Sequence, residues 1–308
     1  MRIPVAFICD DNFVMQTSVA ITSMMKNKSK DTEYTIYVIM AECSPESETK
    51  LKKTADVKII RAGLERFEGI KQLAHISPAC LLKFFLCELI PCEEKILYLD
   101  GDIIVRDDLT LLFKTELGEN YAAAIPLGID YGKFNAGVML FNGEKMRSDH
   151  MAEKLLDFRK RIGNAYSMDQ QTFNNMIADH VVRFPARYNC VPFRIKESVR
   201  EKSLDALNAQ NGTSYKSVKE LLNDAGIVHF ASRTKPWECT FLDFSKEWFN
   251  YYLQSPYGDI PLHRQTKIVF TLKNLRRTRV CTFAREKIGL TRKKNAGQRI
   301  RDQWDKTI

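Results

Sequence analysis

Apolar segments typical of buried strands alternate with segments of helical spacing over the first 105 residues. Strands are predicted at 5–9, 34–40, 57–60 and 95–105, the last interrupted by Asp100-Gly101-Asp102, and helices at 13–26, from Pro45 onward and at 78–90. Strands separated by helices imply right-handed crossovers and a mainly parallel sheet. We therefore expect an α/β fold, in which ligands bind beyond the carboxyl ends of the strands.

The second half of the chain is more mixed. Strands are predicted at 121–126, 137–141 and 227–231, and helices at 150–162, 169–178 and 244–253. Because no linker separates the halves, we expect a single catalytic domain over residues 1–260, followed by a basic, helical tail over 261–308. No uncharged apolar run reaches the roughly 18 residues that a membrane-spanning helix needs. The N-terminal residues lack the anatomy of a signal peptide.

Charge distinguishes the tail from the rest of the chain. The sequence carries a net charge of +9, whereas residues 264–308 alone carry +11, so the preceding 263 residues carry −2. The tail would dock on an anionic membrane surface, at about 1 kcal/mol per cation, or it would be a solvated disordered segment. Its apolar side would comprise Ile268, Val269, Leu272, Leu275 and Phe283.

Nucleic-acid binding by the same charges is the competing interpretation of the tail. We disfavour it because the body of the chain is slightly acidic and contains no recognised nucleic-acid module. The eight cysteines form no C-x-x-C pair and no zinc spacing, and several lie within apolar runs, as buried reduced thiols do. We expect a cytoplasmic protein, peripheral on the inner face of the plasma membrane.

Two carboxylates follow the apolar run of the fourth strand, in Tyr98-Leu99-Asp100-Gly101-Asp102. Residues i and i+2 at a strand end can point the same way, and a glycine between them lets another group approach the backbone. Two converging carboxylates fit a hard divalent cation whose other ligands are water and phosphate oxygens. An Asp-Gly hairpin turn is the alternative, although a surface turn does not require apolar residues on both sides.

His229 lies at another predicted strand end, in Val228-His229-Phe230. A lone histidine in such a place is most often an ordinary core or surface residue. Beside two carboxylates, an imidazole would favour Mn²⁺ over Mg²⁺. The spacing does not show whether His229 meets Asp102, because they are far apart in the chain.

Asp10-Asp11-Asn12 closes the first predicted strand. We expect one of these residues to cap the following helix. The functional interpretation is recognition of a nucleoside, with a carboxylate accepting from a base N–H or a ribose hydroxyl.

Three later segments also combine polar residues with strand or helix ends. Phe134-Asn135-Ala136-Gly137 places an amide before two small residues and a strand. Asp169-Gln170-Gln171 opens a helix, where an acidic residue is also favoured by the helix dipole. Lys235-Pro236-Trp237 follows His229 closely, and its lysine would either meet a phosphate oxygen as a point charge or lie exposed in a turn.

In this order along the chain, the segments resemble glycosyltransferase family eight, the retaining galactosyl- and glucosyltransferases that include bacterial lipopolysaccharide galactosyltransferases and glycogenin. The similarity runs from about residue 3 to residue 255 and also includes Ile76-Ser77. It implies a GT-A fold with a Rossmann-like nucleotide-binding domain, a UDP-hexose donor, Mn²⁺ with Mg²⁺ as the alternative ion, and retention of the anomeric configuration. Motifs for P-loop, dinucleotide, zinc-protease and esterase chemistry are absent from the sequence.

The resemblance also implies roles for individual residues. The ligands of Mn²⁺, which the diphosphate of UDP would complete, are Asp100, Asp102 and His229. Uracil and ribose would be contacted by Asp10 and Asn12. The donor sugar and its phosphates would be bound by Lys83, Asp100, Asn135, Ala136, Asp169 and Lys235, and Gln170 would lie beneath the anomeric carbon.

The sequence departs from the family pattern at four places. Lys83 stands where the family usually has an arginine, so the charge is kept and the bidentate fork is lost. Gln171 replaces the second aspartate of the common D-Q-D, and Ser232 replaces a glycine. The segment between Ile125 and Phe134 is short and has Pro126 where related enzymes often have a sugar-binding aspartate, so the donor sugar stays open.

The resulting hypothesis is a metal-dependent retaining hexosyltransferase that moves galactose or glucose to a hydroxyl of a surface glycan or glycolipid, of lipopolysaccharide or capsule type. Because Gln170 is an amide and a poor nucleophile, front-face attack by the acceptor is favoured, with Asp169 as the next candidate nucleophile. The alternatives are another sugar-nucleotide enzyme such as a nucleotidyltransferase, a protein that binds UDP-sugar without turnover, and a non-catalytic nucleic-acid-binding protein.

Overall fold

The structure is a computed structural model that describes residues 1–70, 77–126, 133–162 and 169–269. The chain divides into two compact units. The first comprises Met1–Ser232 and Glu247–Pro261, and the second comprises Arg233–Lys246 and Leu262–Ile308. Several expectations fall outside the described residues: Ile76 of the family resemblance, most of the segment before Phe134, and the tail from residue 270 onward.

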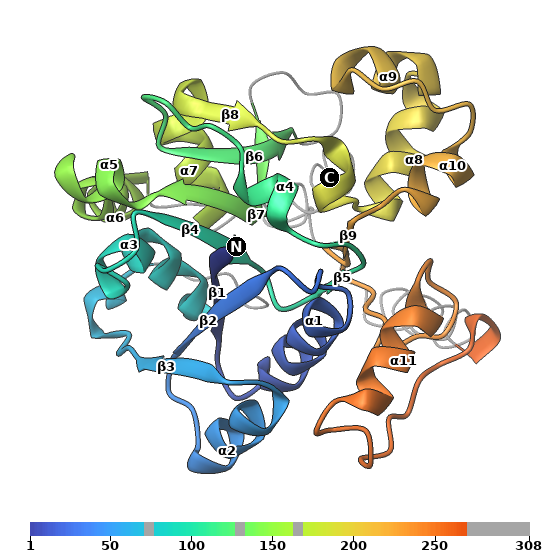
Figure 1. Ribbon diagram of the computed structural model, residues 1–308, viewed down its shortest axis with the longest axis horizontal. Helices are drawn as coiled ribbons and strands as arrows, with labels where there is room; N and C mark the ends of the chain where they lie inside the picture. Colours follow the sequence, from blue (N-terminus) through green and yellow to red (C-terminus); the bar gives the residue numbers. More distant parts are fainter. Residues whose placement is uncertain (71–76, 127–132, 163–168, 270–308) are drawn as a thin grey trace, which may run out of the picture. The chain divides into compact units, whose positions relative to one another are not determined.

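A seven-stranded sheet forms the centre of the first unit, in the order β3-β2-β1-β4-β7-β6-β8 (Figure 1). Its strands are β1 (Arg2–Cys9), β2 (Glu33–Met40), β3 (Val57–Arg61), β4 (Lys95–Leu99), β6 (Ala122–Pro126), β7 (Phe134–Asn142) and β8 (Val181–Arg183). Strands β1 to β4 pair in parallel, as do β6 and β8. The predicted mainly parallel α/β sheet is thus confirmed, although β7 runs antiparallel to β4 and β6.

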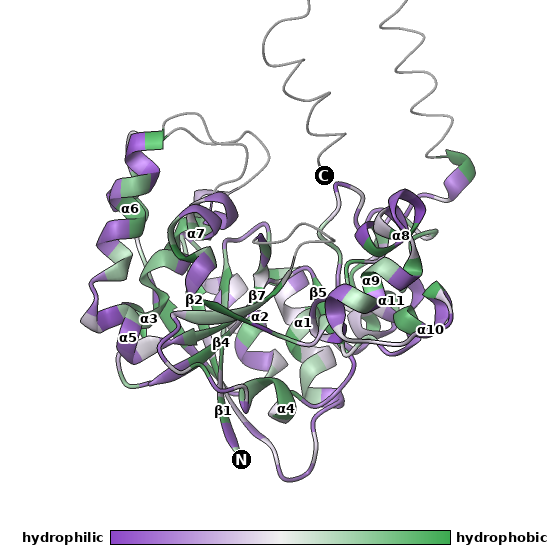
Figure 2. Cartoon of the chain, turned by 90° about the horizontal axis from the view of Figure 1, so that it is seen from above, coloured by the Kyte–Doolittle hydropathy of each residue, from purple (hydrophilic) through white to green (hydrophobic). Residues whose placement is uncertain are grey.

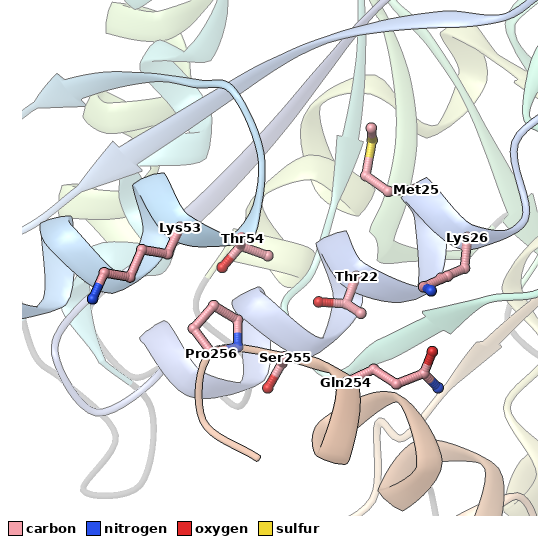
Figure 3. A pocket seen from close by; sticks show the side chains of 8 residues that line it. All are labelled: Thr22, Met25, Lys26, Lys53, Thr54, Gln254, Ser255 and Pro256. Carbon is pink, nitrogen blue, oxygen red and sulfur yellow. The ribbon is translucent and has the colours of Figure 1, made fainter. Parts of the chain in front are cut away.

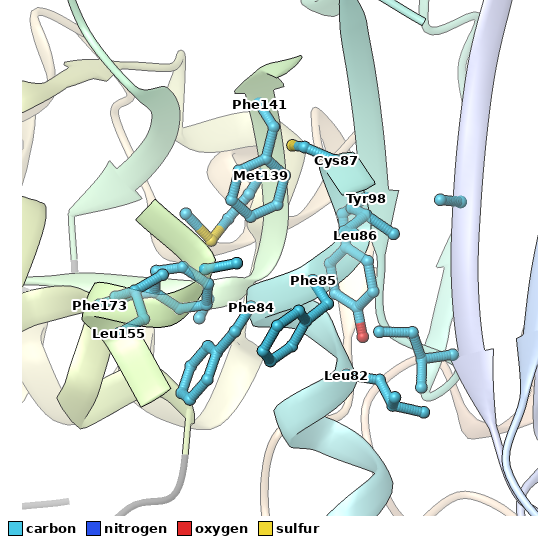
Figure 4. Packing of buried hydrophobic residues seen from close by; sticks show 14 of the residues in the cluster. Leu82, Phe84, Phe85, Leu86, Cys87, Tyr98, Met139, Phe141, Leu155 and Phe173 are labelled. Atoms are coloured by element: carbon cyan, nitrogen blue, oxygen red, sulfur yellow. The ribbon is translucent and has the colours of Figure 1, made fainter. Parts of the chain in front are cut away.

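The strands β1, β2 and β4 are buried on both faces and are apolar at nearly every position. Alternate residues of a strand point to opposite faces. One face packs on a cluster that joins Tyr98, Met139 and Phe141 of the sheet to Phe84 and Phe173 of the covering helices (Figure 4). Helix α1 (Val14–Lys26) packs against β1, α2 (Pro45–Thr54) and the short strand β5.

Helix α2 begins as the sequence predicts. Ser44 is its N-cap and accepts a hydrogen bond from the backbone N of Ser47, and Pro45 occupies the first turn. The expected cap of α1 by an acidic or amide residue is wrong, since Phe13 is the N-cap and makes no side-chain bond there. Asp10 instead accepts from the backbone N of Asn12 at 3.0 Å, which closes an Asx turn.

The helix predicted at 78–90 is mostly a different structure. Pro78–Phe85 forms a 3₁₀-helix, η2, and only Leu86–Leu89 is α-helical, as α3. Five consecutive side chains of η2 are buried: Leu81, Leu82, Lys83, Phe84 and Phe85. A helix buried on only one side shows a single apolar stripe, whereas this run is apolar or buried at successive positions, so its pattern does not distinguish an α-helix from a 3₁₀-helix.

The strand predicted at 95–105 divides at Gly101. The first part is β4 of the large sheet, and the second part is β5 (Ile103–Val105), which pairs antiparallel with β9 (Ile227–His229) in a separate two-stranded sheet. A Cβ at Gly101 would lie 2.6 Å from Oγ1 of Thr17 and 3.0 Å from the ring of Phe13. The chain can therefore pass this close to α1 only with a glycine at the division.

The other helices flank these sheets in chain order. They are η1 (Glu65–Phe67), α4 (Thr110–Phe113), α5 (Gly143–Ser148), α6 (Met151–Ile162), α7 (Asp169–Ile177), η3 (Ala178–His180), η4 (Ala186–Asn189), α8 (Pro192–Glu201), α9 (Leu204–Asn211), α10 (Val218–Asn223) and α11 (Ser245–Gln254). Figure 2 shows α6 with polar and apolar residues interleaved, as a helix buried on one side requires. Helices α8, α9 and α10 were not predicted.

In the second unit, the guanidinium of Arg264 connects neighbouring segments. It donates to the backbone oxygens of Pro236 (2.8 Å), Cys239 (3.1 Å) and Ser245 (2.9 Å). Ile268 and Val269 are exposed at 72% and 43%. No helix in the described part of the chain combines the length and hydrophobicity that spanning a bilayer demands.

Candidate active site

Three side chains that are far apart in the sequence converge at the carboxyl end of β4. Nε2 of His229 lies 3.1 Å from Oδ1 of Asp102 and 3.6 Å from Oδ2 of Asp100. Potential ligand atoms of all three residues lie within 4.8 Å of one another. His229 is 2% exposed and Asp102 7% exposed, whereas Asp100 is only partly buried. The structure thus brings together the three residues predicted to hold a metal ion.

Backbone pairing explains why His229 meets the two acids. The antiparallel register of β5 and β9 places Ile103 opposite His229, and the N of Phe230 donates to the O of Asp102 at 2.9 Å. On the other side of Gly101, the N of Asp100 donates to the O of Gly137 on β7 at 2.8 Å. Asp100 is therefore fixed to the large sheet, and Asp102 is fixed to the strand that carries the histidine.

Gly137 leaves the space that this arrangement needs. A Cβ at this position would lie 2.2 Å from Cε1 of His229 and 2.6 Å from Oδ2 of Asp100. Two carboxylates and one imidazole form a donor set that binds Mn²⁺ and related divalent ions. The residues present therefore fit a divalent cation, and a larger residue than glycine would occupy the space in which they converge.

Lys83 lies beside this cluster and is 2% exposed. Its Nζ donates to the backbone O of Ala136 at 2.9 Å and to Oδ2 of Asp169, and it lies 3.4 Å from Oδ1 of Asp100. Burial alone lowers the pKa of Lys83, but the carboxylates of Asp100 and Asp169 outweigh burial and raise the pKa above its usual value. The protonated Lys83 thus connects Asp100, which is predicted to bind the metal, with Asp169, which is predicted to bind the donor.

Tyr98 completes the surroundings of Asp100. Its hydroxyl donates to Oδ1 of Asp100 at 2.7 Å, and the ammonium of Lys83 lies 4.3 Å from the centre of its ring. Burial, followed by the charge of Asp100, raises the pKa of the Tyr98 hydroxyl. The tyrosine therefore stays a neutral donor that orients this carboxylate.

The amides predicted to bind the donor sugar contact one another. Nδ2 of Asn135 donates to Oε1 of Gln170 at 3.0 Å, and the backbone N of Ala136 donates to the same oxygen at 3.3 Å. The sequence predicted that Asn135 precedes a strand, but Asn135 lies within β7. Gln170 and Asp169 open α7, in agreement with the predicted helix start.

The loop that follows β1 lies next to the same strand ends, since β1 and β4 are parallel neighbours. Asp10 is partly exposed and Asn12 is exposed. Asp11 instead binds the start of α2, where it accepts from the backbone N of Ser44 at 2.9 Å. The contacts of Asp10 and Asn12 with uracil and ribose stay predictions.

Lys235 belongs to the second unit. Its Nζ lies 5.7 Å from the centre of the ring of Trp237, a cation–π distance. The predicted contact of Lys235 with a diphosphate stays a prediction.

Sequence reasoning missed Asn189 at this site. Its side chain is 5% exposed and contacts both Nδ1 of His229 (2.9 Å) and Oδ1 of Asn135 (2.8 Å). Asn189 ends the short 3₁₀ turn η4 and follows no predicted strand. An isolated amide in such a turn gives no sequence signal, and only the fold shows its position.

A separate cavity of about 450 Å³ lies between the C-terminal ends of α1, α2 and α11 (Figure 3). Its lining consists of Thr22, Met25, Lys26, Lys53, Thr54, Gln254, Ser255 and Pro256. It contains none of the residues predicted for catalysis, donor binding or metal binding, and its two lysines are exposed. The cavity is therefore not the predicted active site.

A sequence model of one enzyme family, glycosyl transferase family 8, matches residues 4–240. The chain belongs to glycosyl transferase family 8. The match covers all but the first two residues of the large sheet and all three converging residues, so the resemblance seen in the separate motifs is confirmed. The predicted enzyme class, a hexosyltransferase, is confirmed at the level of this family.

Curated glycosyltransferases are similar over most of this chain. The glycosyltransferase GlyE of Streptococcus pneumoniae is 28% identical over 279 residues, which span 82% of this chain and 65% of GlyE. The lipopolysaccharide 1,2-glucosyltransferase of Escherichia coli is 24% identical over 289 residues, which span 84% of this chain and 80% of that enzyme.

Solved structures of glycosyltransferases show the same fold. The galactosyltransferase LgtC, in complex with donor and acceptor sugar analogs, superposes with a TM-score of 0.69 and 25% identity over 82% of this chain and 96% of LgtC. The structure of GlyE superposes with a TM-score of 0.64 and 26% identity over 83% of this chain and 61% of GlyE. The expected GT-A fold is therefore confirmed.

Proposed function

We propose that this protein is a metal-dependent retaining glycosyltransferase that moves galactose or glucose from a UDP-sugar to a hydroxyl of a surface glycan of lipopolysaccharide or capsule type. The proposal rests mainly on the convergence of Asp100, Asp102 and His229 in a chain of family 8. A glucosyltransferase of lipopolysaccharide and a galactosyltransferase are both among its relatives, which supports this class of donor and acceptor.

The three converging residues would hold a divalent cation, with Mn²⁺ favoured by the imidazole. When bound, such an ion supplies Lewis-acid neutralisation of the charge that develops on the departing diphosphate. The surrounding residues orient these ligands. Tyr98 and Lys83 contact Oδ1 of Asp100, which leaves its Oδ2 directed toward His229.

The hydrogen bonds around Gln170 support front-face attack by the acceptor. Its Oε1 already accepts from Asn135 and from the backbone of Ala136, so its lone pairs are engaged. The Asp169 carboxylate is paired with the ammonium of Lys83, which reduces its nucleophilicity. Neither candidate nucleophile is therefore prepared to form a covalent intermediate.

In the proposed step, the oxygen of the acceptor hydroxyl bonds to the anomeric carbon on the face that the diphosphate leaves. The bond between this carbon and the phosphate oxygen breaks, and the acceptor proton passes to the departing phosphate. Asn135 and Asp169 would hold hydroxyls of the donor sugar. Gln170 would place its amide beneath the oxocarbenium-like centre and orient it.

The basic tail would dock the enzyme on an anionic membrane surface, close to a lipid-linked or surface acceptor. The exposure of Ile268 and Val269, in the first ten residues of the tail, supports an apolar contact there. Flotation of the full chain with anionic vesicles, compared with neutral vesicles and with a salt-titrated DNA shift, tests this. Binding to DNA without binding to vesicles would contradict it.

The activity is tested by incubating the protein with Mn²⁺ and a panel of UDP-sugars and measuring UDP released by slow hydrolysis, which needs no acceptor. We expect UDP from UDP-galactose or UDP-glucose. Asp100→Asn should abolish the release, whereas Asp205→Asn, at an exposed position of α9, should not. Release of pyrophosphate would indicate a nucleotidyltransferase, and binding without any release would indicate a non-catalytic protein.

A further inference from the structure

A chain of hydrogen bonds connects His229 with Gln170 through two asparagine side chains. Nδ1 of His229 lies 2.9 Å from Oδ1 of Asn189. Nδ2 of Asn189 donates to Oδ1 of Asn135 at 2.8 Å, and Nδ2 of Asn135 donates to Oε1 of Gln170 at 3.0 Å. The chain therefore runs from a predicted metal ligand to the residue predicted to lie beneath the reacting sugar.

Two backbone N–H groups fix the direction of these hydrogen bonds. The N of Gly137 donates to Oδ1 of Asn135 at 3.0 Å, and the N of Ala136 donates to Oε1 of Gln170 at 3.3 Å. If the amide of Asn135 or Gln170 were turned over, its NH₂ group would face a backbone donor. Asn189 must then donate to Asn135, so its own oxygen is the atom that faces His229.

This direction determines which nitrogen of His229 carries the proton. Oδ1 of Asn189 can only accept, so Nδ1 of His229 is the donor. In the neutral imidazole, the lone pair is then on Nε2, which is the nitrogen that faces Asp100 and Asp102. A metal-binding histidine typically donates its other N–H to a fixed partner, which sets both its tautomer and its ring orientation.

The backbone holds Asn189 beside His229. The N of Cys190 donates to the O of Ile227 at 2.9 Å, and the N of His229 donates to the O of Cys190 at 2.8 Å. Both the backbone N–H and the backbone C=O of Cys190, the residue after Asn189, thus form hydrogen bonds with β9. Because Asn189 and His229 are also 5% and 2% exposed, water competes little for their hydrogen bond.

We propose that Asn189 is a positioning residue, which holds His229 with Nε2 available to the cation and connects it through Asn135 to Gln170. The inference rests on the proposed function, because it assigns Asn189 a role toward the same cation and donor. It adds that the metal ligands and the sugar-binding amides are oriented by one shared side chain.

The test separates the two hydrogen bonds of Asn189. Binding of Mn²⁺ to the full chain, without any sugar nucleotide, is measured by the electron paramagnetic resonance signal of the free ion. Asn189→Ala removes both bonds, and we expect Mn²⁺ affinity to fall about 10- to 100-fold. The Asn189→Asp variant can still accept from His229, so we expect its Mn²⁺ affinity to be at least equal to that of the wild type. It cannot donate to Asn135, so we expect its rate of UDP release to be lowered at least about tenfold.

Asn208→Ala is the matched control. Asn208 is also buried and bonded through both ends of its amide, but its partners are Thr213 and Tyr215. We expect this variant to lose stability without losing Mn²⁺ affinity. Wild-type Mn²⁺ affinity in Asn189→Ala would overturn the inference, whether or not the protein transfers sugar. If the Mn²⁺ affinities are as expected but the protein turns over no UDP-sugar, the proposed function is contradicted and the role of Asn189 toward the metal is not.

A measurement on the wild type covers the case in which Asn189→Ala does not fold. The chain has five histidines, so ¹⁵N spectra of their rings are simple, and the signal of His229 is identified by its loss in His229→Gln. With diamagnetic Cd²⁺ bound, we expect the proton of His229 on Nδ1. A proton on Nε2 would overturn the inference.

Discussion

The buried Lys83 forms an ion pair with the partly buried Asp169, and the same ammonium group also lies 3.4 Å from Asp100. Replacing Lys83 with methionine leaves these two carboxylates together without a compensating cation. We expect the free energy of unfolding to fall by about 3–5 kcal/mol, measured in urea without metal. Saturating Mn²⁺ should restore part of this loss, because a cation would again face Asp100.

The control for this variant is Lys52→Met, which removes a lysine paired with Glu48 at the surface. It should change the unfolding free energy by less than about 1 kcal/mol. Equal effects of the two substitutions would contradict a central role for the Lys83 charge.

The pKa of Lys83 gives a pH dependence with a definite sign. A group whose pKa is raised by folding stabilises the fold fully below its unfolded pKa of about 10.4, and this contribution is lost as the pH rises through the folded value. The difference in unfolding free energy between wild type and Lys83→Met should therefore be constant from about pH 6 to 9 and shrink at higher pH. Urea titrations at each pH measure this difference in unfolding free energy. If the difference already decreased as the pH rose from about 6 to 9, the raised pKa of Lys83 would be contradicted.

Gly137→Ala tests the space in which the metal ligands converge. The added Cβ would meet His229 and Asp100 at less than van der Waals distance. We expect Mn²⁺ affinity to fall at least about tenfold, as judged by the signal of the free ion. Gly63→Ala is the control, because its Cβ would meet only the side chain of the exposed Glu65, which can move away.

Cation binding should stabilise the folded chain. At a free Mn²⁺ concentration of about 100 times Kd, linkage predicts about 2.7 kcal/mol of added stability, which a thermal unfolding scan detects. Removal of the ion with EDTA should reverse this gain and abolish UDP release. Asp102→Asn should remove most of the gain, and an undiminished thermal response in that variant would exclude Asp102 as a ligand.

Gln170→Ala distinguishes front-face attack from double displacement. If Gln170 only orients the donor, its loss should lower UDP release by about 10- to 100-fold without abolishing it. Mass spectrometry of wild-type protein with donor should detect no glycosyl adduct on Gln170 or Asp169. A stable adduct on either residue would support a covalent intermediate instead.

The sequence allowed six of the seven strands of the large sheet to be predicted, because their apolar runs can be recognised one at a time, whereas the three-residue strand β8 was missed. It also allowed the polar residues at the strand ends to be singled out, since Asp100 follows β4, Asp102 precedes β5 and His229 ends β9. Their convergence could not be predicted, because it depends on the antiparallel pairing of two three-residue strands, β5 and β9.

The features that the sequence did not reveal have physical causes. Helical spacing predicts an α-helix at 78–90, but Pro78–Phe85 is the 3₁₀-helix η2 with five successive buried side chains, and such an apolar run does not distinguish the two windings. Lys83 has the sequence context of a core position, and only the carboxylates that surround it explain a buried cation. Asn189 could not be found because its importance comes entirely from partners 40 and 54 residues away.

The division of the chain at Gly101 has a mechanical consequence. Asp100 is bonded to the large sheet, while Asp102 and His229 belong to the small one. An ion bound by all three residues would connect the large sheet with the two-stranded sheet. Binding of the cation should therefore slow amide hydrogen exchange in β5 and β9. Removal of the cation should restore the faster exchange.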